Sequence, residues 1–327
     1  MKLATRDNGE RDGCLVVVSG DLTLMADAAD IAPTLQLALE QAARVWPALQ
    51  ARYQALNARR YPAAQPYDPR RLLAPLPRAW QWLDGSAFLS HGERMQRAFH
   101  LPPIAGADQT PLMYQGSGDD FLAPHAGIVC RRVEDGLDFE GEFAVVVDEV
   151  PQGCSPQQAL SCIRLIVLLN DIRLRALAPH EMQTGFGFIH AKPASAFAPV
   201  ALTPDELGQA WQHGRAALTL QVTRNGKPFG CQSGSEMHFH FGELIAHAAQ
   251  TRRLRAGTVV GSGTVSGPDA SRGASCIAEV RAIEMLAFGE PRTPFLSPGE
   301  RVTMEAHAPD GRPLFGVLDQ HVVMLTE

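Results

Sequence analysis

The sequence lacks three features that mark common classes of protein. Its longest apolar runs, near Val145 and Leu165, are too short to span a membrane, and its first residues lack the apolar core of a signal peptide. It has no Lys/Arg-rich segment, and its net charge of −6 argues against a nucleic-acid-binding surface. Its six cysteines include no Cys-x-x-Cys pair, which is typical of reduced, buried thiols. We therefore expect a cytoplasmic protein that binds neither membranes nor nucleic acid.

The composition is that of an ordinary globular protein, with 45% hydrophobic and 20% charged residues over 327 positions. This length predicts one large domain with a smaller companion. We assign residues 1–80 to a small N-terminal domain with a proline-rich linker, and residues 81–327 to the larger domain. The first part shows strand patterns at 14–18 and 22–25, and a helical pattern over 35–49 that a proline interrupts. Nothing in the first part suggests chemistry.

The second part is predicted to be strand-dominated, with a few helices. Ser155 before Pro156 is a good helix start, and apolar residues recur at helical spacing to about Leu169. Asn225-Gly226 is a strong signal for a two-residue hairpin turn. Further helices are expected up to His100 and over 241–248, and further strands over 217–222, 258–265, 278–285, 301–306 and 314–325.

One acidic stretch has a pattern that points to metal binding. In an extended strand, alternation sends Asp138, Glu140 and Glu142 to one face. Phe139 and Phe143 then point to the other face, ahead of an apolar run that enters the core. Neighbouring carboxylates repel one another, and a divalent cation such as magnesium, calcium or manganese removes that penalty. A solvated acidic sheet edge is the commoner meaning, and the stretch alone leaves both interpretations open.

The order and spacing of three motifs carry a family resemblance. Glu140-Gly141-Glu142 precedes an apolar strand, Leu168-Leu169-Asn170-Asp171 follows about thirty residues later, and Gly263-Thr264-Val265-Ser266-Gly267-Pro268 lies near the C-terminus. From about Trp82 to Val323 the sequence resembles the fumarylacetoacetate hydrolase family. The N-terminal part fits its longer members, which resemble fumarylacetoacetase. The resemblance implies a strand-dominated α+β fold, a mixed β-sandwich roll with a small N-terminal β-rich domain.

The resemblance also implies a set of site residues. It places a metal site for Mg²⁺ or Ca²⁺, with Mn²⁺ as a further possibility, on four carboxylates: Asp84, Glu140, Glu142 and Asp171. The implied catalytic residues are His91, its partner Glu279, and Lys192. The implied substrate contacts are Tyr114, Arg175 and Thr264.

Two departures from the family pattern bear on the chemistry. Fumarylacetoacetate hydrolases have a glutamine and a second substrate tyrosine where this sequence has Ala178 and Met182. How the distal carboxylate of a substrate is held is therefore open. Smaller relatives that cleave acylpyruvates pair the histidine with a glutamate three residues later, where this sequence has Arg94. This favours the longer branch and the pairing of His91 with Glu279.

The activity that the resemblance implies is metal-dependent hydrolysis of the C–C bond of a small 1,3-diketo acid. The substrate would be fumarylacetoacetate, in tyrosine degradation, with His91 activating water and Lys192 stabilising negative charge on oxygen. Acylpyruvate or fumarylpyruvate hydrolysis and oxaloacetate decarboxylation are alternatives on the same fold. A non-catalytic metal-binding protein is a third, although a structural ion needs neither His91 nor Lys192. The family is commonly dimeric, so we expect a homodimer.

Overall fold

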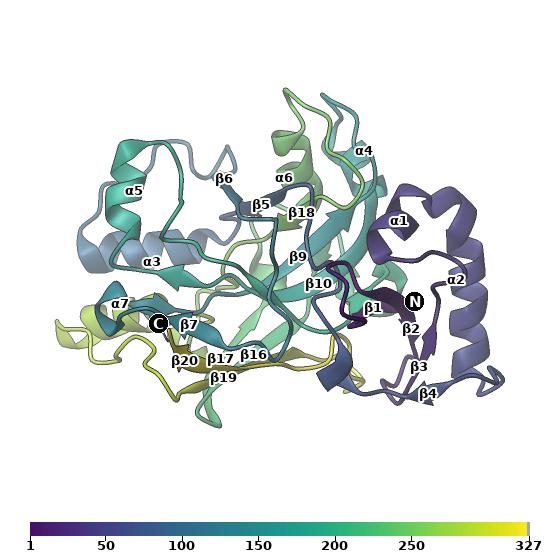
Figure 1. The fold of residues 1–327 in the computed structure, drawn as a ribbon. Coiled ribbons are helices and arrows are strands. Elements are labelled where there is room, and N and C mark those ends of the chain that lie inside the picture. Colours follow the sequence, from purple (N-terminus) through teal and green to yellow (C-terminus); the bar gives the residue numbers. More distant parts are fainter. Residues whose placement is uncertain (326–327) are drawn as a thin grey trace.

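An eleven-stranded sheet runs through the computed structural model, which describes residues 1–325 (Figure 1). Ten strands form a continuous path, and β12 (Ala196–Phe197) pairs with β10 beside it. The order of the path is β4 (Gln65–Pro66), β3 (Leu24–Asp27), β2 (Cys14–Val18), β1 (Lys2–Arg6), β13 (Ala201–Leu202), β10 (Ile163–Asn170), β9 (Gly141–Val147), β18 (Val259–Gly261), β5 (Trp82–Gly85) and β6 (Met113–Gly116). The N-terminal strands therefore extend the central sheet, through antiparallel pairing of β1 with β13.

A second sheet packs beneath the first, and the two make a strand-rich α+β sandwich. Its order is β17 (Lys227–Ser233), β16 (Thr219–Arg224), β19 (Arg301–Ala306), β20 (Leu318–Met324) and β7 (Ile128–Cys130). Phe143 and Val145 of β9 share one buried cluster with Leu220 and Met304 of this sheet. Two short pairs complete the strands: β8 (Leu137–Asp138) with β11 (Arg173–Leu174), and β14 (Trp211–Gln212) with β15 (Arg215–Ala216).

Two N-terminal helices cover the opposite face of the large sheet (Figure 1). They are α1 (Leu35–Glu40) and α2 (Ala42–Asn57). Leu39 and Leu49 pack there with Ala144 and Val146, the β9 residues that alternate with Val145. Helix α2 continues through Pro47 because its buried face, not its full set of hydrogen bonds, holds it to the sheet.

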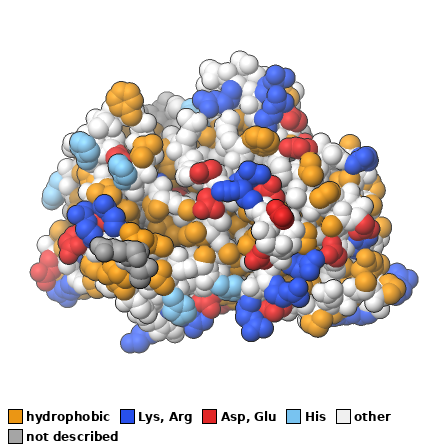
Figure 2. Space-filling model, in the orientation of Figure 1, with side chains coloured by type: hydrophobic (Ala, Val, Ile, Leu, Met, Phe, Trp, Pro, Cys, Tyr) orange, Lys and Arg blue, Asp and Glu red, His pale blue; other side chains and the backbone are white. Residues whose placement is uncertain are grey.

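The remaining helices lie around the sandwich. They are α3 (Leu89–Phe99), α4 (Pro156–Ser161), α5 (Ala178–Thr184), α6 (Phe241–Ala248) and α7 (Ile277–Phe288). Short 3-10 turns span Pro69–Arg71, Val133–Asp135, Pro204–Ala210, Gly234–Glu236 and Ala270–Arg272. Within residues 1–325 no helix has the length and apolarity needed to cross a membrane. Acidic and basic side chains are interspersed over the face seen in Figure 2.

Several predicted elements are confirmed, among them the strand over 14–18, the helix over 241–248 and the Asn225-Gly226 turn between β16 and β17. The helix predicted over 155–169 is wrong beyond Ser161. The apolar run after it is strand β10, which lies inside the sheet and is buried on both faces. A strand in that position has a continuous apolar sequence, which periodicity alone does not distinguish from a buried helix.

The strand predicted over 278–285 is also wrong, because this segment belongs to α7. The carboxylate of Asp138 caps its N-terminus by accepting the backbone N–H groups of Ile277 and Ala278, at 2.8 and 3.0 Å. The acidic stretch is likewise not one continuous strand. Asp138 pairs with Arg173 in the short β8–β11 ladder, and β9 begins only at Gly141.

Candidate active site

A cavity of about 490 Å³ opens beside the C-terminal end of β5 and the N-terminal end of β9. This volume is in the range of small-molecule sites. Its wall also includes α3, the β6 strand and the segment that follows β11. Seven of the ten predicted site residues line it: Asp84, His91, Tyr114, Glu140, Glu142, Lys192 and Thr264.

Three buried carboxylates converge on one side of the cavity, and we call them the carboxylate cluster: Asp84 of β5, Glu142 of β9 and Asp171, which follows β10. One oxygen from each lies within 4.8 Å of the others. Strand β18 separates β5 from β9, and its Gly261 pairs with both Asp84 and Ala144. A Cβ atom on Gly261 would lie 2.2 Å from Asp84 Oδ1, so glycine is required for Asp84 to reach across β18.

The three residues of the carboxylate cluster differ in how many hydrogen-bond donors they have, and Glu142 has the fewest. Neither carboxylate oxygen of Glu142 accepts a hydrogen bond from a donor in residues 1–325. Asp84 Oδ1 accepts the Gly263 N–H at 3.2 Å, and Asp171 Oδ1 accepts the Ser195 hydroxyl at 2.6 Å. Burial, and then the charge of Asp171, raises the pKa of Asp84 to about 7. Burial and the neighbouring acids raise the pKa of Glu142 well above its usual range. Hard, buried oxygens that lack donors fit a divalent cation.

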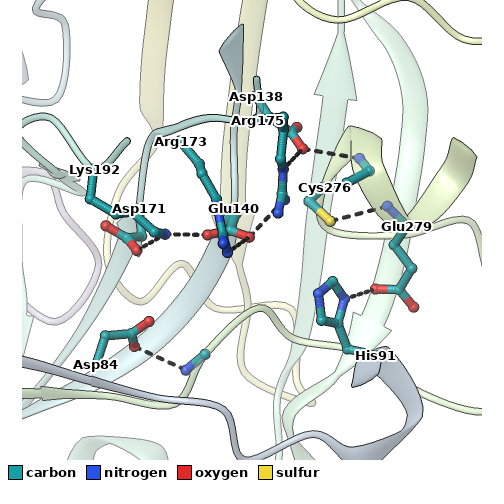
Figure 3. A network of polar contacts seen from close by, with 12 residues as sticks. Asp84, His91, Asp138, Glu140, Asp171, Arg173, Arg175, Lys192, Cys276 and Glu279 are labelled. Carbon is teal, nitrogen blue, oxygen red and sulfur yellow. Dashed lines mark hydrogen bonds and ion pairs between the residues drawn. The ribbon is translucent and has the colours of Figure 1, made fainter. Parts of the chain in front are cut away.

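Glu140, the fourth predicted metal ligand, lies beside this cluster in a network of ion pairs (Figure 3). Lys192 Nζ donates hydrogen bonds to both Glu140 and Asp171. Arg175 Nη2 donates to Glu140 Oε1 at 2.7 Å. Burial alone would raise the pKa of Glu140, but the charges of Arg175 and Lys192 hold it well below its usual range. Glu140 is therefore an ionised carboxylate with cationic partners.

His91 and Glu279, which we call the dyad, meet on the other side of the cavity. His91 lies in the first turn of α3, and its Nδ1 is 2.9 Å from Glu279 Oε2 in the first turn of α7. Arg94 and Ser266 both donate to the other carboxylate oxygen. Burial would raise the pKa of Glu279, but the hydrogen bonds and charges of these partners lower it. An ionised carboxylate only accepts, so neutral His91 carries its proton on Nδ1 and keeps a lone pair on Nε2.

Tyr114 and Lys192 form an ordered wall next to the carboxylate cluster. The Tyr114 hydroxyl donates to Asp171, and Lys192 Nζ lies 5.3 Å from the Tyr114 ring centroid. The Phe188 ring packs edge-on against Tyr114, with centroids 5.0 Å apart. Thr264, 7% exposed, lines the cavity beside Gly263. The Tyr114 hydroxyl is thus already engaged in orienting Asp171.

Arg175, predicted to contact substrate, is not brought to the cavity surface. Its Nε donates to Asp138 Oδ2 at 2.8 Å and its Nη2 to Glu140, so both ends of the guanidinium are occupied. Because Asp138 also caps α7, Arg175 ties Glu140 to the helix that carries Glu279. The physical reason for the difference is that two buried carboxylates lie closer to Arg175 than the cavity does.

Arg173, which the sequence interpretation missed, lines the cavity instead. It lies in β11, two residues after Asp171 and two before Arg175. Alternation in an extended segment places residues two apart on one face. Spacing alone does not single out Arg173, because the same alternation would also place Arg175 on that face.

The comparisons with known proteins agree on one family. Residues 81–323 match the family model "Fumarylacetoacetate (FAA) hydrolase C-terminal", and residues 1–78 match "Fumarylacetoacetase N-terminal domain 2". The chain is 26% identical over 160 residues to 2,4-didehydro-3-deoxy-L-rhamnonate hydrolase of Sphingomonas sp.. It is 27% identical over 159 residues to the oxaloacetate tautomerase YisK of Bacillus subtilis. These matches cover 48% and 49% of this chain, and 53% and 49% of those proteins.

A solved structure has the same fold over its whole length. It is maleylpyruvate hydrolase from Sphingobium sp. SYK-6 in complex with manganese(II) ion and pyruvate. It superimposes with a TM-score of 0.66 at 16% identity, and the match covers 100% of both chains.

Proposed function

Because the chain belongs to the fumarylacetoacetate hydrolase family, we propose that it is a metal-dependent hydrolase of 1,3-diketo acids. The observation that carries this proposal is the placement of the carboxylate cluster and the dyad in one cavity. A cation site and an oriented base are the two components that hydrolysis of a C–C bond between carbonyl groups needs. A metal-binding protein without activity would have no use for the dyad.

The carboxylate cluster would hold the ion, with Glu140 next to it. Mg²⁺, Ca²⁺ and Mn²⁺ all suit oxygen ligands, and the manganese in the maleylpyruvate hydrolase structure supports this group of metals. When bound, the ion supplies Lewis-acid polarisation of the dicarbonyl oxygens. Lys192, a buried cation that contacts Glu140 and Asp171, adds positive charge on the same side.

The dyad supplies the proton transfers. His91 Nε2 takes a proton from water, and the resulting hydroxide attacks the acyl carbonyl carbon. Glu279, ionised and fixed by Arg94 and Ser266, stabilises the imidazolium that forms. As the C–C bond breaks, the proton on Nε2 passes to the departing carbon. One water is consumed, and one acid and one ketone are released.

The acyl group is the finer part of the proposal. We favour fumarylacetoacetate, with fumarate and acetoacetate as products, and keep acylpyruvates such as fumarylpyruvate as the alternative. A second reaction class is proton transfer or decarboxylation on oxaloacetate. The match to an oxaloacetate tautomerase favours considering it, because the dyad is equally a base for an acidic C–H group. The homodimer and the cytoplasmic location remain predictions.

An isotope experiment separates these reactions. Protein treated with chelator and reloaded with Mg²⁺ or Mn²⁺ is given fumarylacetoacetate, fumarylpyruvate or oxaloacetate in H₂¹⁸O. Hydrolysis places one ¹⁸O atom in the new carboxylate, which mass spectrometry detects, and His91→Gln is the matched control that should leave the diketo acids intact. Carbon dioxide release or enol–keto exchange, with no labelled acid from any diketo acid, would contradict the hydrolase proposal.

A further inference from the structure

Arg173 is a partly buried cation with little to bind inside the protein. Its side chain is 17% exposed, and its Nε is buried without a hydrogen-bond partner in residues 1–325. Its Nη1 lies 3.8 Å from Glu140 Oε1, beyond hydrogen-bond distance. The other polar contact is a weak one, from Nη2 to Met182 Sδ at 3.7 Å. A guanidinium has five N–H donors, so most of the hydrogen-bonding capacity of Arg173 is unused.

The neighbouring cations show that this shortage is specific to Arg173. Arg175 donates to two carboxylates, and Lys192 also donates to two. Glu140 is shared between these two cations, so it has little left for Arg173. Leaving buried donors without acceptors is unfavourable, and more so when the group is charged. Arg173 therefore has N–H donors available for an acceptor that comes from outside the chain.

The surroundings of Arg173 orient it toward the cavity. The guanidinium carbon lies 5.2 Å from the centroid of the Phe188 ring, which in turn packs against Tyr114. Stacking on an aromatic face leaves the edges of the guanidinium plane available. Phe188 and Met182 both line the cavity with it. A planar cation with free edges in a largely apolar wall suits a carboxylate, which it can hold through two parallel hydrogen bonds.

We propose that Arg173 binds a second carboxylate of the substrate, and so selects dicarboxylic diketo acids over neutral acyl analogues. This rests on the proposed function, in which the dicarbonyl oxygens are assigned to an ion at the carboxylate cluster. It also answers how a distal carboxylate is held without the family glutamine and tyrosine, which are Ala178 and Met182 here.

The kinetic experiment compares two acylpyruvates of equal length, one ending in a carboxylate and one in a methyl group. In the metal-loaded wild type the first should have the higher kcat/KM. Arg173→Met should lower the ratio of the two kcat/KM values about 10- to 100-fold, mainly through KM, as expected for one lost charged hydrogen-bonding pair. Arg173→Lys should keep part of the preference, because lysine offers charge without the fork. Arg301→Met, which removes an exposed arginine paired with Asp319, should leave the ratio unchanged.

A binding experiment keeps this inference separate from the proposed reaction. Calorimetry measures 2-oxoglutarate and 2-oxopentanoate, which share a keto acid end and chain length, on Mg²⁺-loaded protein. Arg173→Met should weaken only 2-oxoglutarate, again about 10- to 100-fold. Equal weakening of both ligands, or none, would overturn the proposal and leave Arg173 a structural residue. Selective weakening without turnover of any diketo acid would support Arg173 and refute the hydrolase.

Discussion

Two adjoining sides of the site carry buried charge in different ways. On the paired side, formed by Glu140 and, behind the cavity surface, Asp138 and Arg175, every charged group has a close partner of opposite sign. On the unpaired side, which is the carboxylate cluster, Glu142 has no partner of opposite sign in residues 1–325 and lies among other carboxylates. The partners of the paired charges lie within the chain, whereas an unpaired charge requires a partner from outside the chain. The comparison therefore separates residues that hold the architecture from residues that await a ligand.

The same distinction applies to two arginines on one short segment. Arg175 and Arg173 are two residues apart, and both point toward Glu140 (Figure 3). Arg175 donates through Nε and Nη2 to two carboxylates, while Arg173 lines the cavity and its Nε has no hydrogen-bond partner in residues 1–325. Two residues of the same type that lie close in sequence can therefore have different roles. The partners available around each side chain decide it.

The largest effect should come from breaking the unpaired side. Glu142→Gln removes a ligand from the carboxylate cluster, so bound Mg²⁺ or Mn²⁺ should be lost and kcat should fall at least about 10³-fold. With chelator present, this variant should melt above wild type at neutral pH, because the raised pKa of buried Glu142 means that wild type must take up a proton on folding, which glutamine avoids. Elemental analysis and thermal melts check both points, with exposed Glu290→Gln as control. Unchanged metal content would refute the site.

The next largest effect concerns the base. His91→Ala should lower kcat by about 10² to 10⁴, the range for a lost general base, with bound metal retained. Steady-state kinetics and elemental analysis on the same preparation check this. Wild-type kcat in the variant would remove His91 from the mechanism, and loss of metal would instead place His91 among the ligands.

Breaking the paired side should affect stability more than specificity. Arg175→Met leaves the buried Asp138 without its ion-pair partner and Glu140 with Lys192 but without Arg175, which costs about 3–5 kcal/mol of unfolding free energy. Turnover of carboxylate-ended and methyl-ended substrates should fall in proportion. Arg301→Met, which breaks an exposed pair, should cost only about 0–1 kcal/mol in the same urea titration. If Arg175→Met changed the ratio of turnover between the carboxylate-ended and methyl-ended substrates, the prediction that Arg175 contacts substrate would be supported.

The smallest effect concerns the dyad, whose contribution to the free energy of unfolding should depend on pH. Partners hold the pKa of Glu279 below its usual value, so its ionised form stabilises the fold above the unfolded-state pKa of about 4.3. This stabilisation is lost as the pH falls through the folded-state pKa. Glu279→Gln should therefore cost about 1.5–3 kcal/mol near neutral pH and progressively less in acid. A constant difference down to about pH 3 would contradict it.

The amino-acid sequence by itself determined the set of candidate residues, through its resemblance to a family. The motif around Glu140 and Glu142, Asp171 after an apolar run, and the interval from Asp84 to His91 match that family pattern, and Asp84, His91, Glu140 and Glu142 line one cavity. By alternation, the sequence places Glu140 and Glu142 on one face of an extended segment. It also predicted the close approach that Gly261 and Gly263 allow, because only glycine leaves room there.

Only the tertiary structure decided which elements the ambiguous segments form and which charges remain free. The segment 163–170 became a strand because it lies between two others, and 277–288 became a helix because Asp138 caps it from far away in sequence. Glu140 lies in a network of ion pairs, and Arg173 lines the cavity where Arg175 does not. These outcomes depend on partners distant along the chain, and on how many acceptors each buried donor finds, which local spacing does not encode.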